Sequence, residues 1–410
     1  MKTVAIIGAG QRGQDVYAEY IKNHPEQGKV IAVVEPNDYR RNKISKEHRI
    51  KEENIFTNTK DFFSKGKIAD LLIIATMDEM HYKQTLKAID LGYDILLEKP
   101  ISPSKEECLE IVKKSQEKGV LLMICHVLRY TPFFRKIKEI IKSGAIGKVI
   151  NIQHNENVGI WHMAHSFVRG NWRRSEDSSP IILQKSCHDL DILVWLVEDD
   201  CEKISSFGDL TFFTKENKPK GAGDRCIECN VNDCIFDSRK VYLPIKGNWP
   251  ANVVSDIQEE DEMIKALSEN QYGRCVFNCD NTVCDHQVSI IKFKNGVTAT
   301  FNLSGFTHEI SRTIKIMGTK GEIRGNDATN SIEVIKFPSN SMEEIKKEVY
   351  RVEEVNGGHN GGDEGLMKDL FNILTTDNKD SESSANKSLQ SHLMAFAAEE
   401  SRLNNKVVKI

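Results

Sequence analysis

The chain has 410 residues, 39% of them hydrophobic, and its 56 basic and 60 acidic residues leave a net charge of −4. This length predicts two or three domains, and the charge balance argues against nucleic acid or an anionic membrane as a partner. The apolar run over residues 4–7 is too short for a signal peptide or a membrane span. We therefore expect a cytoplasmic protein whose ten cysteines are thiols or metal ligands rather than disulfides.

A glycine-rich turn follows this first predicted strand directly. Gly8, Gly10 and Gly13 have the G-x-G-x-x-G spacing, with Gln11 and Arg12 between the last two. The first glycine permits a tight turn, the second lets the backbone approach a pyrophosphate, and the third lets the next helix pack against the strand. The pyrophosphate would lie at the N-terminus of that helix, where free N–H groups favour negative charge. The turn therefore predicts a dinucleotide site.

The second predicted strand, residues 30–34, ends at an acidic residue. Glu35 stands near the distance beyond the glycines at which a carboxylate bonds the ribose hydroxyls of adenosine. A carboxylate there repels a 2′-phosphate, which favours NAD over NADP. Arg40 and Arg41 are close enough in the sequence to reverse that preference.

Residues 1–125 alternate apolar strands with helical patterns, which is typical of a doubly wound parallel sheet covered by helices. The strands are continuous apolar runs, as expected when both faces of a sheet are buried. Strands are predicted over residues 4–7, 30–34, 71–75, 95–97 and 120–125, and helices over residues 80–91 and 105–117.

Residues 126–410 predict a second domain of the α+β class with a large, mostly antiparallel sheet. An irregular stretch over residues 214–287 holds six of the ten cysteines and has the character of an insertion. An exposed face of such a sheet would suit a homodimer or homotetramer. The predicted elements are a helix over residues 133–143, strands over 149–153, 288–293, 297–303, 313–317 and 332–335, a polar loop over 375–387, a helix near 389–401 and a strand over 407–410.

Short motifs follow one another in a fixed order along most of the chain. They are the glycine turn, Ala75-Thr76 with His81, Glu98-Lys99-Pro100, Arg129 with Pro132, Gly147-Lys148-Val149, His188-Asp189-x-Asp191 and Gly318-x-x-Gly321. This series resembles the Gfo/Idh/MocA family, the group of glucose-fructose oxidoreductase and inositol dehydrogenase. The resemblance implies a Rossmann domain that binds NAD or NADP and a second domain that presents a sugar, cyclitol or related polyol. It implies cofactor contacts from Gly8, Gly10, Gln11, Arg12, Gly13, Glu35, Thr76, His81, Glu98 and Lys99.

Lys99 is the first candidate for a catalytic group. Oxidation of a secondary alcohol sends a hydride to nicotinamide and needs a side chain that accepts the hydroxyl proton. Lys99 follows a buried strand at the carboxyl edge of the predicted sheet, where ligands bind in doubly wound folds, and desolvation there lowers the pKa of a lysine. Glu98 would orient Lys99 or touch the nicotinamide ribose. The alternative is a solvated lysine before a turn-forming proline.

His188 is the second candidate, in a helix predicted from about residue 182 to residue 197. Helical spacing would bring Gln184 and Lys185 onto the same face as the histidine. Family members commonly carry Asp at the position of Gln184, so the carboxylate that would raise the basicity of the histidine is absent. Lys185 adds a cation that would stabilise an alkoxide or enolate. The alternative for His188 is a structural histidine on an amphipathic helix.

The predicted loop over residues 159–174 is rich in cationic and aromatic side chains. An Arg side chain can fork a carboxylate, and a Trp ring can cover the C–H face of a sugar. The alternative is a surface loop held by its own ion pairs. The candidate substrate ligands are His165, Arg169, Trp172 and Arg173, in a cluster that also contains His162 and Arg174.

A second glycine-rich stretch, residues 357–363 (GGHNGGD), places His359 and Asp363 in a flexible frame. It resembles the Gly-His-Gly-Gly pattern of family members that are glycosidases. The resemblance implies that His359 reaches the sugar, whereas the simpler alternative is a turn.

The cysteines of the insertion are not required by the family's fold. A C-x-x-C turn presents two thiolates to one ion, and structural zinc takes four thiolate or imidazole ligands. The preferred zinc ligands are Cys226, Cys229, Cys234 and Cys275, with Cys279, Cys284 or His286 as substitutes. Free thiols, an iron–sulfur cluster and a redox disulfide are the alternatives.

Three functions remain open at the level of sequence. The leading hypothesis is an NAD-dependent oxidoreductase that acts on a sugar or sugar derivative, with Lys99 and His188 handling the proton. The second is a redox-neutral glycosidase, in which NAD oxidises the sugar transiently, a substituent is eliminated, and the hydride returns. The third is an NAD-binding sensor without turnover, which the replacement of the usual Asp by Gln184 favours.

Overall fold

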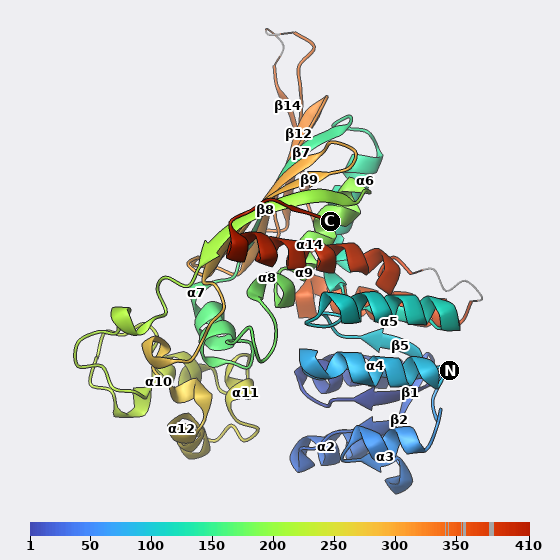
Figure 1. Ribbon diagram of the computed structural model, residues 1–410, viewed down its shortest axis with the longest axis vertical. Helices are drawn as coiled ribbons and strands as arrows, with labels where there is room; N and C mark the ends of the chain where they lie inside the picture. The colour runs from blue at the N-terminus through green and yellow to red at the C-terminus, as the bar shows by residue number, and fades with distance from the viewer. Residues whose placement is uncertain (341, 343, 354, 356–357, 377–380) are drawn as a thin grey trace.

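The computed structural model describes residues 1–410 except 341, 343, 354, 356–357 and 377–380. Within the described residues the strands form a six-stranded sheet and a nine-stranded sheet. Figure 1 shows the two sheets one above the other along the long axis of the molecule, with α14 across their junction. The predicted fold class, a parallel doubly wound sheet followed by an α+β unit, is confirmed.

The first sheet is parallel throughout and has the order β3-β2-β1-β4-β5-β6. Its central strands are completely buried because helices cover both faces. The strand order reverses between β1 and β4, and ligands of such sheets bind beyond the carboxyl ends of the strands at this point. The strands are β1 (Lys2–Ile7), β2 (Gly28–Val34), β3 (Ile55–Phe56), β4 (Leu71–Ile74), β5 (Asp94–Leu97) and β6 (Leu122–Ile124).

The segment after the glycine turn is a wide helical turn, η1 (Gln11–Ala18), which continues into α1 (Glu19–Asn23). Polar caps begin several of the other helices. Ser104 accepts a hydrogen bond from the N–H of Glu107 at the start of α5, for example. The remaining helices of this half are α2 (Asp38–His48), α3 (Thr59–Ser64), α4 (His81–Asp90) and α5 (Lys105–Lys118).

The second sheet has the order β14-β13-β12-β11-β7-β10-β9-β8-β15 and is antiparallel except for the pair β7 and β10. Helices pack on one of its faces, where the apolar side chains of alternate strand residues form the largest core of the molecule. The strands are β7 (Val149–Asn157), β8 (Cys201–Asp209), β9 (His286–Phe293), β10 (Thr298–Ser304), β11 (Ser311–Gly318), β12 (Gly321–Asn326), β13 (Ser331–Lys336), β14 (Lys346–Arg351) and β15 (Val408–Lys409).

The helices of this half lie mainly between the two sheets (Figure 1). Helix α14 is the longest, and it contacts both β8 of the second sheet and α5 of the first half. The helices are α6 (Pro132–Lys142), α7 (Ile160–His162), α8 (Ile181–Gln184), α9 (Cys187–Val197), α13 (Gly362–Leu374) and α14 (Ala385–Asn404), with the helical turns η4 (Val127–Tyr130), η5 (Met163–Arg169) and η11 (Gly358–Gly361).

The irregular stretch over residues 214–287 projects to one side of the molecule (Figure 1). It contains the short helices α10 (Ser238–Tyr242), α11 (Ala251–Val254) and α12 (Glu260–Glu269). A small core of its own holds them together, formed by Tyr242, Ala251, Val254, Met263, Leu267 and Tyr272. We call residues 214–287 the insertion, as the sequence suggests.

The structure differs from the sequence-based elements in several respects. The strands β3, β8, β12 and β14 are not among the predicted strands, α2, α3 and α13 are not among the predicted helices, and α14 begins within the predicted polar loop. The edge strand β14 has mostly exposed, charged residues and lacks an apolar alternation. The helix predicted from about residue 182 to 197 is interrupted, because α8 ends at Gln184 and α9 begins at Cys187. Of the polar loop predicted over residues 375–387, residues 377–380 lie outside the described part of the chain.

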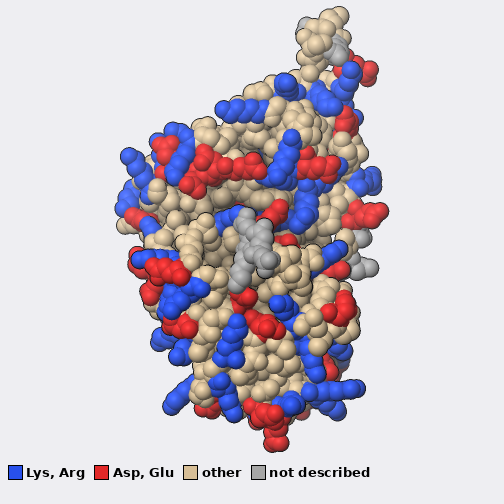
Figure 2. Space-filling model, turned by 90° about the vertical axis from the view of Figure 1, so that its right-hand side faces the viewer, with Lys and Arg blue, Asp and Glu red and all other residues tan. Residues whose placement is uncertain are grey.

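No helix in the described part of the chain is both long enough and apolar enough to cross a membrane. Figure 2 shows basic and acidic side chains interspersed over one face of the molecule. This mixed surface agrees with the small net charge of −4.

Candidate active site

The glycine turn has no room for a side chain at two of its three glycines. Gly8 has a φ of +91°, and a Cβ there would lie 2.5 Å from the carbonyl oxygen of Ala75. A Cβ on Gly13 would lie 1.9 Å from the carbonyl oxygen of Gly8. At Gly10, by contrast, no described atom lies within 4 Å of the Cβ position. Gly10 is therefore the open point of the turn, as expected for the glycine that faces a pyrophosphate.

Glu35, at the end of β2, lies against this turn. Its Oε2 accepts a hydrogen bond from the N–H of Ala9 at 2.7 Å, and its Oε1 accepts one from Asn37 at 2.9 Å. The guanidinium of Arg41 donates to the backbone oxygen of Glu35 at 2.8 Å, whereas Arg40 reaches the insertion. The carboxylate thus joins the turn to the second strand at the place predicted for the adenosine ribose.

Arg12 connects the glycine turn to two carboxylates that are distant in sequence. Its Nε lies 2.5 Å from Oε1 of Glu98, and its Nη2 lies 2.7 Å from Oδ1 of Asp363. Burial alone would raise the pKa of both carboxyl groups, but the positive charge of Arg12 holds each pKa below its ordinary value. The hydroxyl of Tyr17 also donates to Glu98. Both carboxylates are therefore ionised and held in place at the carboxyl edge of the first sheet.

Lys99 reaches from the first half of the chain to the second. Its Nζ donates to the backbone oxygen of Gln184 at 2.6 Å. A continuous helix would use that oxygen for the N–H of His188, so the lysine fits the interruption between α8 and α9. The side-chain amide of Gln184 points elsewhere and donates to the backbone oxygens of Ser179 at 2.5 Å and Trp172 at 3.2 Å. Gln184 therefore holds the preceding loop and is not presented beside His188 by helical spacing.

His188 is buried on α9, and its ring centroid lies 6.0 Å from that of His359. Burial, together with the charge of Lys99, holds the pKa of His188 well below its ordinary value. Its Nδ1 has no hydrogen-bond partner among the described residues. His359 in turn lies 3.0 Å, Nδ1 to Oδ2, from Asp363. A neutral imidazole at the position of His188 can accept a proton. Gly357 of the second glycine-rich stretch lies outside the described residues.

Lys185 belongs to a buried charged network. Its Nζ lies 3.3 Å from Oε1 of Glu156, which also pairs with Arg312. Arg312 donates from Nε to Oδ1 of Asp189 at 2.8 Å, and His154 lies 2.8 Å from the same oxygen. Burial lowers the pKa of Lys185, and the charge of Glu156 opposes that shift.

Sequence reasoning missed Glu156 and Arg312 altogether. They are direct partners in the antiparallel register of β7 and β11, which are far apart in the chain. The sequence shows only a Glu shortly after a predicted strand, and it does not indicate which residue would pair with it.

His81 and Thr76 act differently from the cofactor contacts that the family resemblance implies. The ring of His81 is completely buried, with Nδ1 2.7 Å from the backbone oxygen of Pro100 and Nε2 3.1 Å from that of Thr76. The hydroxyl of Thr76 donates to Gln84 at 2.7 Å. These side chains hold the loop after β4 against the loop after β5, so they shape the sheet edge and His81 has no ring nitrogen left for a cofactor.

Two of the predicted substrate ligands face the insertion. Nδ1 of His165 lies 3.0 Å from the hydroxyl of Tyr242. Arg169 donates to the backbone oxygens of Phe236 and Arg274, both at 2.7 Å, and is only 1% exposed. These contacts attach η5 to the insertion, and the role of both side chains as substrate ligands stays a prediction.

The other cationic and aromatic side chains of this loop contact different parts of the molecule. Arg173 pairs with Asp280 of the insertion at 2.7 Å, and Trp172 packs against the core of the second sheet. His162 is different, because burial and then the charge of Lys185 hold its pKa well below the ordinary value. The ring of His162 packs against the rings of Phe167 and Trp249, with centroid distances of 5.6 and 5.0 Å.

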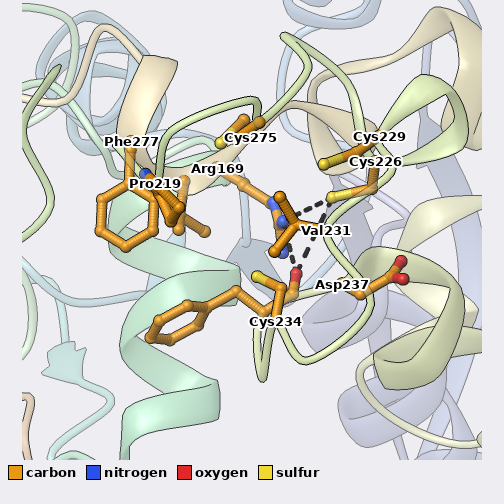
Figure 3. Close-up of a pocket in the computed structure, with 12 residues that line it drawn as sticks. Arg169, Pro219, Cys226, Cys229, Val231, Cys234, Asp237, Cys275 and Phe277 are labelled. Carbon is orange, nitrogen blue, oxygen red and sulfur yellow. Dashed lines mark hydrogen bonds between the residues drawn. The ribbon is translucent and has the colours of Figure 1, made fainter. Parts of the chain in front are cut away.

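The four predicted zinc ligands line one pocket around Arg169 (Figure 3). Nη2 of Arg169 lies 3.3 Å from the sulfur of Cys226, so a guanidinium stands among the thiols. In the part of the chain that the structure describes, no three His, Cys, Asp or Glu side chains are arranged to hold a metal ion. The structure thus does not support the zinc prediction. The pocket is lined by Cys226, Cys229, Cys234 and Cys275.

Comparison with known proteins identifies the family to which the chain belongs. Residues 2–126 match the model of the oxidoreductase family's NAD-binding Rossmann fold, and residues 138–410 match its C-terminal alpha/beta domain. YteT of Bacillus subtilis, an oxidoreductase by name, is 26% identical over 313 residues, which cover 74% of this chain and 72% of that protein.

Two further proteins are similar. A 2,7-anhydro-N-acetylneuraminate hydratase of Mediterraneibacter gnavus is 29% identical over 261 residues, 62% of this chain and 65% of that protein. The structure of a levoglucosan dehydrogenase with NADH and levoglucosan covers 100% of this chain and 99% of its own, with 17% identity and a TM-score of 0.73. Because the two family models match most of the chain, it belongs to the Gfo/Idh/MocA family of oxidoreductases and carries that family's NAD-binding Rossmann domain.

Proposed function

We propose that the protein transfers a hydride between NAD and a hydroxyl-bearing carbon of a sugar, cyclitol or sugar derivative. One chain of contacts carries this proposal. Arg12 of the glycine turn binds Asp363, Asp363 binds His359, and the ring of His359 lies beside His188. The same Arg12 binds Glu98, which precedes Lys99. The dinucleotide turn and the candidate proton-transfer groups are thus parts of one connected arrangement.

The cofactor supplies the hydride acceptor, and the side chains handle the proton. His188, whose Nδ1 has no partner among the described residues, can accept the hydroxyl proton of an alcohol, and the cation of Lys99 can stabilise the alkoxide that forms. Lys185 adds a second cation that is held by Glu156. Because these charged groups are buried, their effect on a developing charge is larger than in water.

Glu35 supports NAD as the preferred dinucleotide. Its carboxylate lies on the turn, where it would repel a 2′-phosphate. The guanidinium of Arg41 is bound to the backbone oxygen of Glu35, and Arg40 pairs with Asp256 of the insertion. We expect calorimetry to give a lower Kd for NAD than for NADP, and Glu35→Gln to narrow the difference. Tighter binding of NADP by the unmodified protein would contradict this assignment.

The test of the main proposal is a sugar panel assayed by NADH formation, repeated with Lys99→Met and His188→Asn. Each variant should lower kcat/KM by about 10²- to 10⁴-fold while the Kd of NAD changes less than about threefold. The separation of the two readouts distinguishes lost chemistry from lost folding. Unchanged turnover in Lys99→Met would show that Lys99 does not take part in the reaction.

A redox-neutral course is the second candidate, because a protein named as a hydratase is similar in sequence to this chain, and the addition of water involves no net oxidation. His359 beside His188 offers a second imidazole for proton transfer at the carbon next to a transient ketone. Product formation without net NADH, with solvent deuterium incorporated at carbon, would favour this course. Stoichiometric NADH would favour the simple dehydrogenase.

A further inference from the structure

The insertion is attached firmly to η5, the helical turn that carries His165 and Arg169. Arg169, at the end of η5, donates to two backbone oxygens of the insertion, as described above. One turn earlier, His165 stacks on Tyr272 with a centroid distance of 4.8 Å and contacts the hydroxyl of Tyr242. Figure 3 shows the guanidinium of Arg169 enclosed by insertion residues. The position of the insertion relative to η5 is therefore determined by buried contacts.

The insertion also reaches the NAD-binding half of the chain. Asp256, which follows α11, lies 3.3 Å from the guanidinium of Arg40 on α2. Arg40 is five residues beyond Glu35, so this contact lies near the predicted adenosine side of the dinucleotide site. The insertion thus contacts both η5 of the second domain and α2 of the first. We call the part of the insertion that spans these two contacts the wall; it lies to one side of the molecule (Figure 1).

One aromatic side chain of this wall remains available to a ligand. The ring of Trp249 is 38% exposed, whereas Tyr242 and Tyr272 of the same insertion are buried. The ring packs edge-on against His162, with a centroid distance of 5.0 Å. His162 ends α7, which closely follows β7, the strand that carries Glu156, the partner of Lys185. Trp249 therefore packs against the segment that leads away from the strand of this buried ion pair.

We propose that Trp249 is a stacking platform for a second sugar ring, one that is linked to the reacting ring and lies beyond His162. The reacting ring must lie against Lys99 and His188, so a group on Trp249 is a substituent of that ring rather than the ring itself. A Trp face suits the C–H face of a pyranose. This inference rests on the proposed function and names its substrate class: glycosides and oligosaccharides rather than free monosaccharides.

The experiment compares affinities for matched pairs of ligands: glucose with cellobiose, N-acetylglucosamine with chitobiose, and galacturonate with digalacturonate. Calorimetry on the protein saturated with NADH measures binding without turnover. The unmodified protein should bind at least one disaccharide more tightly than its monosaccharide. Trp249→Ala should weaken that disaccharide about tenfold and the monosaccharide less than about twofold.

Two variants serve as controls. Trp249→Phe keeps an aromatic face and should retain disaccharide affinity within about threefold. Trp161→Ala removes a comparably exposed Trp that precedes His162 on α7 but packs its ring against Phe236, and should change neither affinity. A disaccharide preference that survives in Trp249→Ala, or no preference in the unmodified protein, would overturn the proposal. Failure of the proposed function is a separate result, because it appears as absent turnover in the sugar panel and not in these binding ratios.

Discussion

The parallel sheet and the insertion are stabilised by different kinds of contact. The central strands of the sheet are continuous apolar runs with side chains that are completely buried. The insertion has a small apolar core, and long polar side chains complete it: Arg169 and Arg225 each donate to two backbone oxygens within it. The sheet therefore depends on many interchangeable apolar contacts, whereas the insertion depends on a few individual hydrogen bonds.

This difference shows why the two regions respond differently to a single substitution. An apolar core distributes its stability over many small contributions. A buried guanidinium, by contrast, makes a large contribution to stability at one position, because removing it leaves several carbonyl groups without a hydrogen-bond partner. Within the sheet the sensitive positions are therefore those where the backbone itself leaves no space.

The largest effect is expected at such a backbone position, in Gly13→Ala. The new Cβ would fall 1.9 Å from the carbonyl oxygen of Gly8, so the turn must move. We expect the free energy of unfolding to fall by about 4 kcal/mol, together with loss of NAD binding. Urea denaturation and calorimetry measure the two. Gly10→Ala is the matched control: its Cβ meets open space, so the protein should keep its stability and lose affinity for NAD alone. Equal stability of both variants would contradict the turn geometry.

A single polar contact of the insertion should come next. Arg169→Met would leave the backbone oxygens of Phe236 and Arg274 unpaired and should destabilise the insertion locally by about 3 kcal/mol. Hydrogen exchange should then accelerate over residues 214–287 and stay slow in β1 and β4. Arg173→Met removes a more exposed pair with Asp280 and should cost about 0.5 kcal/mol. Uniform acceleration over both regions would show that they unfold as one unit.

Acid should destabilise the protein through two buried histidines, His392 on α14 and His165 on η5, the turn that contacts the insertion. Burial lowers the pKa of His392 to about 3, and the pKa of His165 also falls to about 3. An unfolded chain protonates each ring near pH 6.5, whereas the folded chain does not until about pH 3, so stability is present above pH 6.5 and falls as the pH drops. Each histidine should cost about 2 kcal/mol between pH 6 and pH 4.5.

Urea unfolding at several pH values measures this slope. His392→Gln should flatten it, because the amide can replace Nε2 as the acceptor for the N–H of Ile101 without titrating. The slope would remain unchanged in this variant if His392 were protonated in the folded protein.

The smallest effect is expected where the two regions meet. Arg40 and Asp256 are both partly exposed, and a surface pair of this kind contributes about 0.5 kcal/mol. A double-mutant cycle with Arg40→Ala and Asp256→Ala, followed by hydrogen exchange near α11, should give a coupling of that size. A coupling above about 2 kcal/mol would mean that the wall and the NAD-binding half are joined more rigidly than this pair implies.

The accuracy of the sequence-based predictions follows the same division. Gly8, Gly10, Gly13 and Glu35 were identified because the spacing of a tight turn and a strand end is a local property of the chain. Lys99 and His188 came from the family resemblance, and the structure places both near Gln184. Arg169 and His165 were predicted as substrate ligands, and the structure places both against the insertion, because cationic and aromatic side chains suit a buried interface as well as a sugar.

The amino-acid sequence alone determined the parallel sheet, its glycine turn and the family, because apolar periodicity and turn geometry act over short distances along the chain. It could not determine which side chains of the loop over residues 159–174 contact the insertion. Nor could it pair Glu156 with Arg312, or bring Trp249 to His162. Those arrangements follow from strand register and from the packing of segments that are far apart in the chain, and such contacts leave no periodic pattern in a single sequence.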